Sequence, residues 1–206
     1  VIKVESHARV DITRRLPIYP DDMEGGVNRS GIFNEWSMGK KSLLLNVAKP
    51  EGMEIVKELI KNSDVVVDNF ATGVMNNLGL NYDELKKIKP DIIVASISGY
   101  GHTGPMQKYM GYGPAMAPIS GLSSLTGYKD GRPQEVGISY GDPNSGIRAA
   151  AAICAALSAR QRTGKGQYID VSLFEAMSVL VSEGWMDHVM NDTQPQRDGN
   201  HDQFMA

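Results

Sequence analysis

The chain has 206 residues, of which 41% are hydrophobic and 22% charged, and its formal net charge is −3 at pH 7. A chain of this length and hydrophobic content buries a core larger than that of one small module. Positive and negative side chains are interspersed, so we expect neither a nucleic-acid-binding surface nor a patch for anionic membranes. No run of about 18 apolar residues is present, which excludes a predicted transmembrane helix.

The single cysteine, Cys154, stands among alanines and is predicted to be a small buried hydrophobe. It allows no disulfide within the chain, which favours a reducing, cytoplasmic location. The sequence opens on Val1–Glu5 with no initial Met and no signal peptide. This opening is typical of a strand entered partway, so we expect the chain to be a fragment.

Apolar runs in the first half predict strands that alternate with helices. Residues 6–31, with Pro17, Pro20 and Gly25, predict a long loop. Strands are expected over residues 1–5, 41–47, 64–70 and 91–98, and helices from Pro50 onward and over 74–78 and 82–88. This order predicts an α/β fold, a Rossmann-like open parallel sheet with helices on both faces.

In the second half of the chain the sequence pattern predicts mainly helices. Residues 100–131 are rich in Gly, Pro and Met. We expect Met106, Met110 and Met116 to fill gaps in the core; the alternative is that they line an acyl pocket. Residues 147–157 predict a buried helix, followed by a strand over 169–173, a helix over 174–189 and a polar linker over 191–201. We expect one large domain over 1–180, with a helix end and linker over 181–206.

Ligands of open parallel sheets bind beyond the carboxyl ends of the strands. In this chain those ends are Leu45-Asn46, Asn69-Phe70 and Gly99-Tyr100. Neither G-x-G-x-x-G after a strand nor G-x-x-x-x-G-K-[ST] occurs, so the two common nucleotide motifs are absent. His7, His102, His188 and His201 form no metal-ligand pattern, and we predict no metal and a solvated loop position for His102.

Asp142 has two readings. Asp followed by Pro143 is a common helix opening, with Asp as the N-cap and Pro at the first helical position. Alternatively, Asp142 is a nucleophile that the helix start keeps ionised, and Gly141 and Gly146 allow a bulky ligand to approach. The residues alone leave both readings open.

Motifs spread over nearly the whole chain carry a resemblance. They are residues 1–5, Thr13-Arg14, 40–46, 50–52, 68–70 with Gly73, 78–80, 98–101, 141–146 and 163–167. In this order they resemble the family III coenzyme A transferases, the family of formyl-CoA transferase and carnitine CoA-transferase. The resemblance implies a Rossmann-like, CoA-binding large domain, an interlocked homodimer at full length, and a fragment that is poorly active alone.

The resemblance also implies that Asp142 is the catalytic nucleophile of a CoA-transferase. Its carboxylate would attack the thioester of an acyl-CoA, and an aspartyl-CoA thioester would then pass CoA to a small carboxylic acid. CoA thioester is the substrate, and no tightly bound cofactor is implied. The alternatives are an isomerase resembling α-methylacyl-CoA racemase and a non-catalytic Rossmann-like module with Asp142 as a helix cap.

The family's CoA contacts correspond here to Leu45, Asn69, Phe70 and Leu78, with Gly141 beside the nucleophile. Ser6, Ala48 and Asn77 stand where formyl-CoA transferase has an arginine, a lysine and an arginine, and Lys49 is adjacent to Ala48. Tyr112 occupies the position of the racemase histidine. A phenol with a pKa near 10 argues against racemisation, and we expect Tyr112 to border the pocket.

Overall fold

The computed structural model describes residues 1–16, 18–19, 26–137 and 139–201, which fall into two compact units, Val1–Leu59 and Ile60–Ala206. Helix α2 (Pro50–Lys61) runs across the boundary between them. Among the described residues, no helix combines the length and the apolar character needed to span a bilayer. The structural division lies at residue 59. It does not test the domain boundary predicted at residue 180, which stays a prediction.

The first unit is built on two parallel strands. Strand β1 (Ile2–Glu5) pairs with β2 (Lys41–Leu44), with Val4 opposite Leu43. Between them come the 3-10 helix η1 (Ile12–Arg15) and helix α1 (Gly31–Trp36). Local capping explains both helices, because the Asp11 carboxylate accepts from the Thr13 N–H and the Ser30 hydroxyl accepts from the Phe33 N–H.

The loop predicted over residues 6–31 was therefore too simple, because η1 forms inside it and α1 begins at its end. The hydrophobic patterns of η1 and α1 are too short to show a helical period. Pro17, Pro20 and Gly25, which suggested the loop, lie outside the described residues.

A buried ion pair fastens η1 to β1. The Arg14 guanidinium donates from Nη2 to Glu5 Oε2 at 2.7 Å and from Nε to Glu5 Oε1 at 3.0 Å. Both residues are 9% exposed, and the guanidinium also lies 3.6 Å from the centre of the Phe33 ring. The hydrogen bonds from Arg14 lower the pKa of Glu5 against the opposing effect of burial.

Replacing Arg14 with Met is expected to destabilise the chain by about 3 kcal/mol, because it leaves the buried Glu5 carboxylate without a cation. The effect should be full above pH 4.5, the ordinary pKa of Glu5, and should shrink in acid as that group protonates. Urea unfolding at several pH values measures it. The matched control is Lys57→Met, which breaks an exposed pair with Glu54 and should cost less than about 1 kcal/mol. Equal losses in the two variants would contradict this account.

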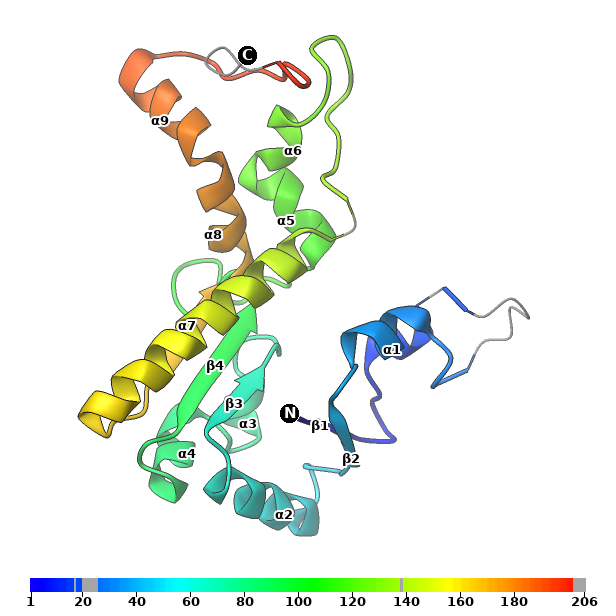
Figure 1. The fold of residues 1–206 in the computed structure, drawn as a ribbon, viewed down its shortest axis with the longest axis vertical. Helices are drawn as coiled ribbons and strands as arrows, with labels where there is room; N and C mark the ends of the chain where they lie inside the picture. The colour runs from blue at the N-terminus through cyan, green and yellow to red at the C-terminus, as the bar shows by residue number, and fades with distance from the viewer. Residues whose placement is uncertain (17, 20–25, 138, 202–206) are drawn as a thin grey trace. The chain divides into compact units, whose positions relative to one another are not determined.

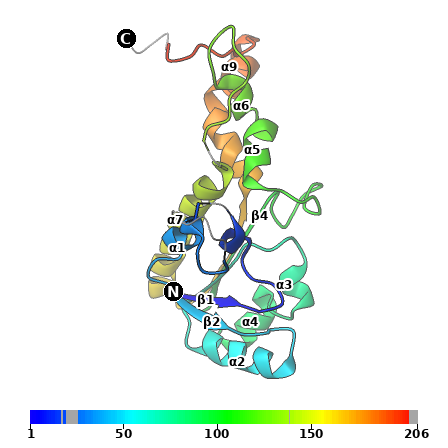
Figure 2. The ribbon, with the colours of Figure 1, turned by 90° about the vertical axis from the view of Figure 1, so that its right-hand side faces the viewer.

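The second unit holds a three-stranded parallel sheet in the order β3 (Val65–Asp68), β4 (Ile93–Ser98), β5 (Tyr168–Ser172). Figure 2 shows α7 (Gly141–Thr163) on one side of β4, and α3 (Val74–Asn77) and α4 (Tyr82–Ile88) on the other. The central strand is largely buried, and the side chains from Ile92 to Ala95 are at most 1% exposed. The predicted α/β class with open parallel sheets is confirmed, although the described strands form two sheets and not one.

A second group of helices lies beyond the carboxyl end of β4 (Figure 1). Buried Met116, Ala117, Leu173 and Met177 form its core. Met116 is thus a core residue as predicted, whereas Met106 and Met110 are 38% and 76% exposed. The elements are α5 (Gly113–Ser120), α6 (Leu122–Leu125), α8 (Leu173–Ser178), η2 (Val179–Val181) and α9 (Ser182–Asn191), so the single helix predicted over 174–189 is interrupted at η2.

The prediction that residues 147–157 form a buried helix was right about the helix and wrong about the burial. Helix α7 packs one face against β4 and β5, and the buried residues Ser145, Ala149 and Ala156 recur at helical spacing on that face. Ile147 is 71% exposed, and Cys154 is also exposed. The predicted burial of Cys154 is therefore wrong. Small apolar residues occur on more than one face of α7, so the sequence does not indicate which face is buried.

Candidate active site

Asp142 lies in the first turn of α7 without capping that helix. The helix begins at Gly141, the N-cap position is Tyr140, and no side chain caps the helix. The Asp142 backbone N–H donates to the Ser139 carbonyl at 2.9 Å. The carboxylate instead lies against Gly113, whose backbone N–H lowers the pKa of Asp142. The reading of Asp142 as a plain N-cap is wrong, because its side chain faces another helix.

Glycine allows the two helix starts to meet. A Cβ built on Gly113 would lie 2.3 Å from Asp142 Oδ2, and one built on Gly141 would lie 3.1 Å from the Gly113 carbonyl oxygen. Gly113 is the first residue of α5, where backbone N–H groups are unpaired within the helix and the helix dipole is positive. The first turn of α5 therefore offers a donor to the Asp142 carboxylate at a distance that no larger residue permits.

A second glycine contact positions the segment before α5. A Cβ on Gly99, directly after β4, would lie 2.5 Å from the Cα of Gly111. The backbone of residues 111–113 can therefore cross the end of β4 at van der Waals distance and continue to Asp142. Sequence reasoning missed Gly113; the signal that could have found it is the alternation Gly111-Tyr112-Gly113, although glycines are common throughout this segment.

Two hydrogen bonds fix the start of α7. Asn144 Nδ2 donates to the Ala176 carbonyl in α8 at 2.8 Å, and the hydroxyl of buried Ser145 donates to the Gly141 carbonyl at 2.6 Å. Asp142 itself remains exposed to solvent. A carboxylate that is held at its base and open outward has the arrangement required of a nucleophile.

Burial raises the pKa of Asp142 above its ordinary value of 3.8, and the hydrogen bond from Gly113 opposes that shift. Between the ordinary and the raised pKa the folded chain binds more protons than the unfolded chain. Ionisation of Asp142 therefore costs stability as pH rises through this window.

Asp142→Asn should consequently gain stability relative to the parent as pH rises from below 3.8 to neutrality, because the amide does not ionise. The measurement is the difference in free energy of unfolding between the two proteins, followed by urea unfolding across that range. A difference that is constant with pH, or that favours the variant only in acid, would contradict the raised pKa.

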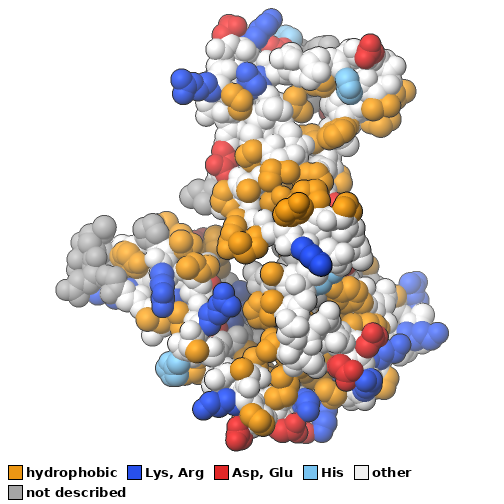
Figure 3. Space-filling view, turned by 180° about the vertical axis from the view of Figure 1, so that it is seen from behind, with side chains coloured by type: hydrophobic (Ala, Val, Ile, Leu, Met, Phe, Trp, Pro, Cys, Tyr) orange, Lys and Arg blue, Asp and Glu red, His pale blue; other side chains and the backbone are white. Residues whose placement is uncertain are grey.

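The surface of the second unit carries hydrophobic side chains, which Figure 3 shows gathered over its middle. Tyr109, Met110 and Tyr112 are 65%, 76% and 70% exposed. Tyr112 is the N-cap residue of α5 and directly precedes Gly113. Of the predicted site residues, Tyr112 and Gly141 are thus the two that the structure brings next to Asp142, by way of Gly113.

Leu45 lies in the first unit, in a pocket of about 350 Å³ at the carboxyl ends of β1 and β2. Its backbone N–H donates to the Glu5 carbonyl at 2.6 Å. Ala48 does not line the pocket, and its N–H donates to Asn46 Oδ1 at 3.0 Å. The lining residues are Ser6, His7, Ala8, Leu44, Leu45, Asn46 and Lys49. Lys49, and not the residue at position 48, therefore supplies the lysine of this pocket.

Asn69 and Phe70 directly follow β3 and are exposed, Phe70 by 47%. Asn77 is the last residue of α3 and Leu78 is its C-cap. Asp68, which precedes them and is 7% exposed, accepts from the Phe70 N–H at 3.2 Å and from the Ser96 hydroxyl at 2.6 Å. The buried carboxylate of Asp68 therefore fixes the turn that carries Asn69 and Phe70.

Replacing Asp68 with Ala should lower the free energy of unfolding by about 2 kcal/mol, because the Phe70 N–H and the Ser96 hydroxyl lose a buried acceptor. Asp68→Asn should recover most of the loss, since its amide oxygen still accepts from the Phe70 N–H. Urea unfolding measures both, with the exposed Asp130→Ala as a control that should change stability by less than about 0.5 kcal/mol. An Asp68→Ala protein as stable as that control would refute the role of the turn.

Within the described ranges, no group of three or more His, Cys, Asp or Glu side chains could hold a metal ion. The backbone N–H of His102 donates to both carboxylate oxygens of Asp170, at 2.9 and 3.1 Å, and the His102 ring packs edge-on against Tyr168. The solvated position predicted for His102 is wrong in part, because its Nε2 atom is buried.

Known proteins align with nearly the whole of this chain. The model of CoA-transferase family III matches residues 1–206. Acetyl-CoA:oxalate CoA-transferase of Acetobacter aceti is 38% identical over 206 residues, which are 100% of this chain and 51% of that protein. Succinate–glutarate CoA-transferase of Agrobacterium fabrum is 34% identical over 201 residues, 97% of this chain and 50% of that protein. A crystal structure of a CAIB/BAIF family protein from Brucella suis superposes with a TM-score of 0.88 at 38% identity, covering 97% of this chain and 52% of that one. The chain spans about half the length of these curated relatives.

Proposed function

Because the chain belongs to CoA-transferase family III, we propose that it is the part of a CoA-transferase that carries the nucleophilic carboxylate, Asp142. The observation that supports this most directly is the position of that carboxylate. It lies against Gly113, its pKa is raised by burial, and it remains exposed to solvent. Neither capping nor an ion pair accounts for this arrangement among the described residues.

The reaction would begin when a carboxylate oxygen of Asp142 attacks the thioester carbon of an acyl-CoA. The carbon–sulfur bond breaks, CoA leaves as a thiolate, and a mixed anhydride remains on the enzyme. The thiolate then attacks the aspartyl carbonyl carbon, which releases the donor acid as a carboxylate and leaves an aspartyl-CoA thioester. The acceptor carboxylate repeats these two steps in reverse and departs as the new acyl-CoA. No proton is transferred, so no histidine base is needed.

Gly113 would serve the reaction in two ways. Its N–H holds the Asp142 carboxylate in one orientation, which limits the conformations that the nucleophile must give up before attack. The same N–H can donate to the aspartyl oxygen when the thiolate adds to that carbonyl and negative charge develops there. The positive end of the α5 dipole acts in the same direction.

Within each unit, the residues proposed to contact CoA lie at or near the carboxyl ends of strands or helices. The contacts proposed from the family are Leu45, Ala48, Asn69, Phe70, Asn77 and Leu78, with Tyr112 and Gly141 beside Asp142. The pocket around Leu45 supports its place in this group, and the exposed ring of Phe70 supports a contact with a flat ligand surface. Lys49 is the cation placed to meet a CoA phosphate in this pocket.

The test is a matrix of acyl-CoA donors and carboxylate acceptors, incubated with the whole protein and followed by liquid chromatography of the CoA esters. The names of the two relatives suggest acetyl-CoA as a donor and oxalate, succinate and glutarate as acids to test. We expect formation of a new acyl-CoA with ping-pong kinetics. Failure of every pair would contradict the proposal.

A racemase resembling α-methylacyl-CoA racemase is the second candidate, and Tyr112 at the position of the racemase histidine disfavours it. Incubation of a 2-methylacyl-CoA with the whole protein in deuterated water separates the two. Deuterium at the α-carbon without CoA transfer would favour the racemase. A homodimer, a cytoplasmic location and the absence of a tightly bound cofactor stay predictions, as does the poor activity of residues 1–206 alone.

A further inference from the structure

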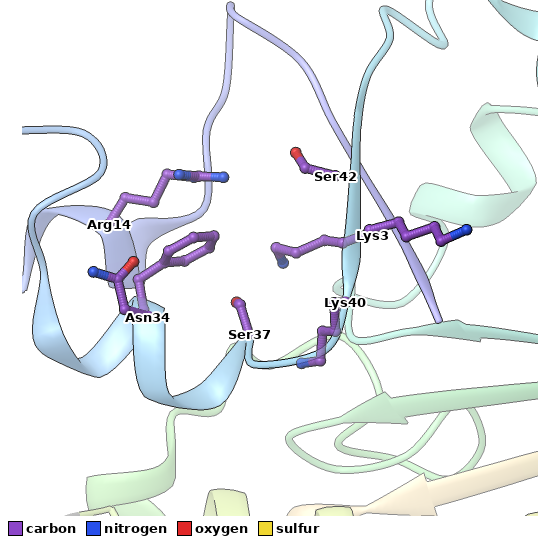
Figure 4. Close-up of a pocket in the computed structure, with 8 residues that line it drawn as sticks. Lys3, Arg14, Asn34, Ser37, Lys40 and Ser42 are labelled. Atoms are coloured by element: carbon purple, nitrogen blue, oxygen red, sulfur yellow. The ribbon is translucent and has the colours of Figure 1, made fainter.

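Charged side chains that already have partners surround the pocket of about 190 Å³ in the first unit, which Figure 4 shows. The Lys3 ammonium lies 2.6 Å from Asp11 Oδ2, and the Arg14 guanidinium donates to both carboxylate oxygens of Glu5. These pairs hold β1 to η1, so they serve the fold of that unit. The carboxylate of Asp170, in the second unit, is used differently.

Asp170 lies on β5, opposite Ser96 of β4, and its carboxylate binds the backbone of the turn that follows β4. The backbone N–H of His102 donates to Oδ2 at 2.9 Å and to Oδ1 at 3.1 Å. Gly101, directly before His102, has a φ of +79°, and a Cβ built on it would lie 3.5 Å from Asp170 Oδ2. Only a residue that accepts a left-handed backbone brings the turn this close to the carboxylate without strain.

Other groups hold the same turn from two more elements. The Thr72 hydroxyl donates to the Gly101 carbonyl at 3.3 Å. The Phe174 N–H, in α8, donates to the Gly99 carbonyl at 2.9 Å. Of these contacts, those to Asp170 are charge-assisted, and hydrogen bonds of that kind are about twice as strong as neutral ones.

The ring of Tyr100 joins this turn to the segment that follows it. It packs against Phe174 with ring centres 5.8 Å apart, and it meets the Tyr109 ring edge-on at 6.2 Å. Aromatic pairs at these distances attract each other beyond the burial of their area. Holding the turn therefore also holds the chain at residue 109.

Backbone contacts between glycines lead from the turn to the nucleophile. A Cβ built on Gly99 would lie 2.5 Å from the Cα of Gly111. Two residues further along, a Cβ built on Gly113 would lie 2.3 Å from Asp142 Oδ2. A shift of the turn is therefore passed on to Gly113, because no side chain stands between the backbones to absorb it.

We propose that Asp170 is a positioning residue for the reaction: by holding the turn at residues 101–102, it keeps Gly113 in place against the Asp142 carboxylate. A nucleophile displaced by about 1 Å loses on the order of a hundredfold in rate, so a residue remote from the chemistry can change turnover without changing binding. The proposal rests on the proposed CoA transfer at Asp142. The backbone of residues 102–113 provides a measurement that is independent of activity.

The kinetic test uses the whole protein with its best donor and acceptor pair. Asp170→Ala should lower the turnover number about tenfold and leave the KM for acyl-CoA within about twofold. Asp170→Asn should recover most of the rate, since its amide oxygen still accepts from the His102 N–H. The control is Asn81→Ala, which removes the side-chain acceptor of the Glu84 N–H at the start of α4. It should lower the melting temperature to a similar extent and leave turnover unchanged.

A double-mutant cycle tests the route from Asp170 to Asp142. If Asp170 acts through Gly113, Asp170→Ala/Gly113→Ala should turn over about as slowly as Gly113→Ala alone. Losses that multiply in the double variant would overturn the proposal. So would an unchanged turnover number in Asp170→Ala, a loss confined to KM, or an equal loss of turnover in Asn81→Ala.

Hydrogen exchange followed by mass spectrometry separates this proposal from the proposed function. Asp170→Ala should speed exchange of the backbone amides over residues 102–113 about tenfold, with residues 93–97 of β4 unchanged. If the parent protein transfers no CoA with any pair, the proposed function fails, and the exchange rates still decide whether Asp170 holds the segment. Unchanged exchange over residues 102–113 would overturn the proposal whatever the activity.

Discussion

Asp142→Asn is expected to abolish CoA transfer in the whole protein while leaving it folded. The amide has the size and shape of the carboxylate that lies against Gly113, so the first turn of α7 keeps its contact with α5. The amide is not a nucleophile toward a thioester, and the turnover number should fall by about a thousandfold or more. Steady-state rates with the best donor and acceptor pair measure the loss. Asp142→Ala, which cannot revert by deamidation, should be equally inactive.

The control is Asp83→Asn, which removes the same charge from the first turn of a different helix, α4. It should transfer CoA at the parental rate. Retention of full activity in Asp142→Asn would refute the assignment of the nucleophile, whereas equal losses in both variants would indicate an effect of charge alone.

Gly113→Ala is expected to produce the second largest loss. The new Cβ would lie 2.3 Å from Asp142 Oδ2, well inside van der Waals distance, so the carboxylate must move. A shift of about 1 Å in a positioned nucleophile costs on the order of a hundredfold in rate. The turnover number should fall while the KM for acyl-CoA changes little, because the alanine methyl contacts the Asp142 carboxylate.

The stability of the Gly113→Ala protein separates misplacement from misfolding. Gly113 does not adopt a positive φ, so alanine fits its backbone conformation. Gly146→Ala, where a Cβ meets open space in α7, should raise the free energy of unfolding by up to about 1 kcal/mol. A Gly113→Ala protein that is folded and fully active would show that this contact does not position the carboxylate.

The strands were predictable because each is a short run between turn residues, either mainly apolar or with apolar and polar residues in alternation. The runs at Val65–Asp68, Ile93–Ser98 and Tyr168–Ser172 form the parallel three-stranded sheet, and the end of the first run predicted the exposed positions Asn69 and Phe70. The short helices η1 and α1 were not predictable, since caps at Asp11 and Ser30 and a buried Glu5–Arg14 pair stabilise them in place of a periodic hydrophobic face.

The candidate site shows the same limit. Asp142 could be singled out from the sequence, but its role as a helix cap or as a partner of α5 depends on a contact across 29 residues. Gly113 makes that contact through its backbone, and a glycine carries no side-chain pattern that reveals which group it approaches. The exposed face of α7 is a further example, because Ile147 and Cys154 are as apolar as the buried alanines beside them.

The most direct test of the account follows oxygen through Asp142. The whole protein is incubated with an acyl-CoA and an acceptor acid whose carboxylate carries oxygen-18, and the tryptic peptide over residues 130–148 is sequenced by mass spectrometry. The mechanism predicts that one labelled oxygen enters the side chain of Asp142, because the acceptor leaves one oxygen on the aspartyl carbon when it takes CoA. New acyl-CoA formed with no label at Asp142 would contradict a covalent intermediate at this residue.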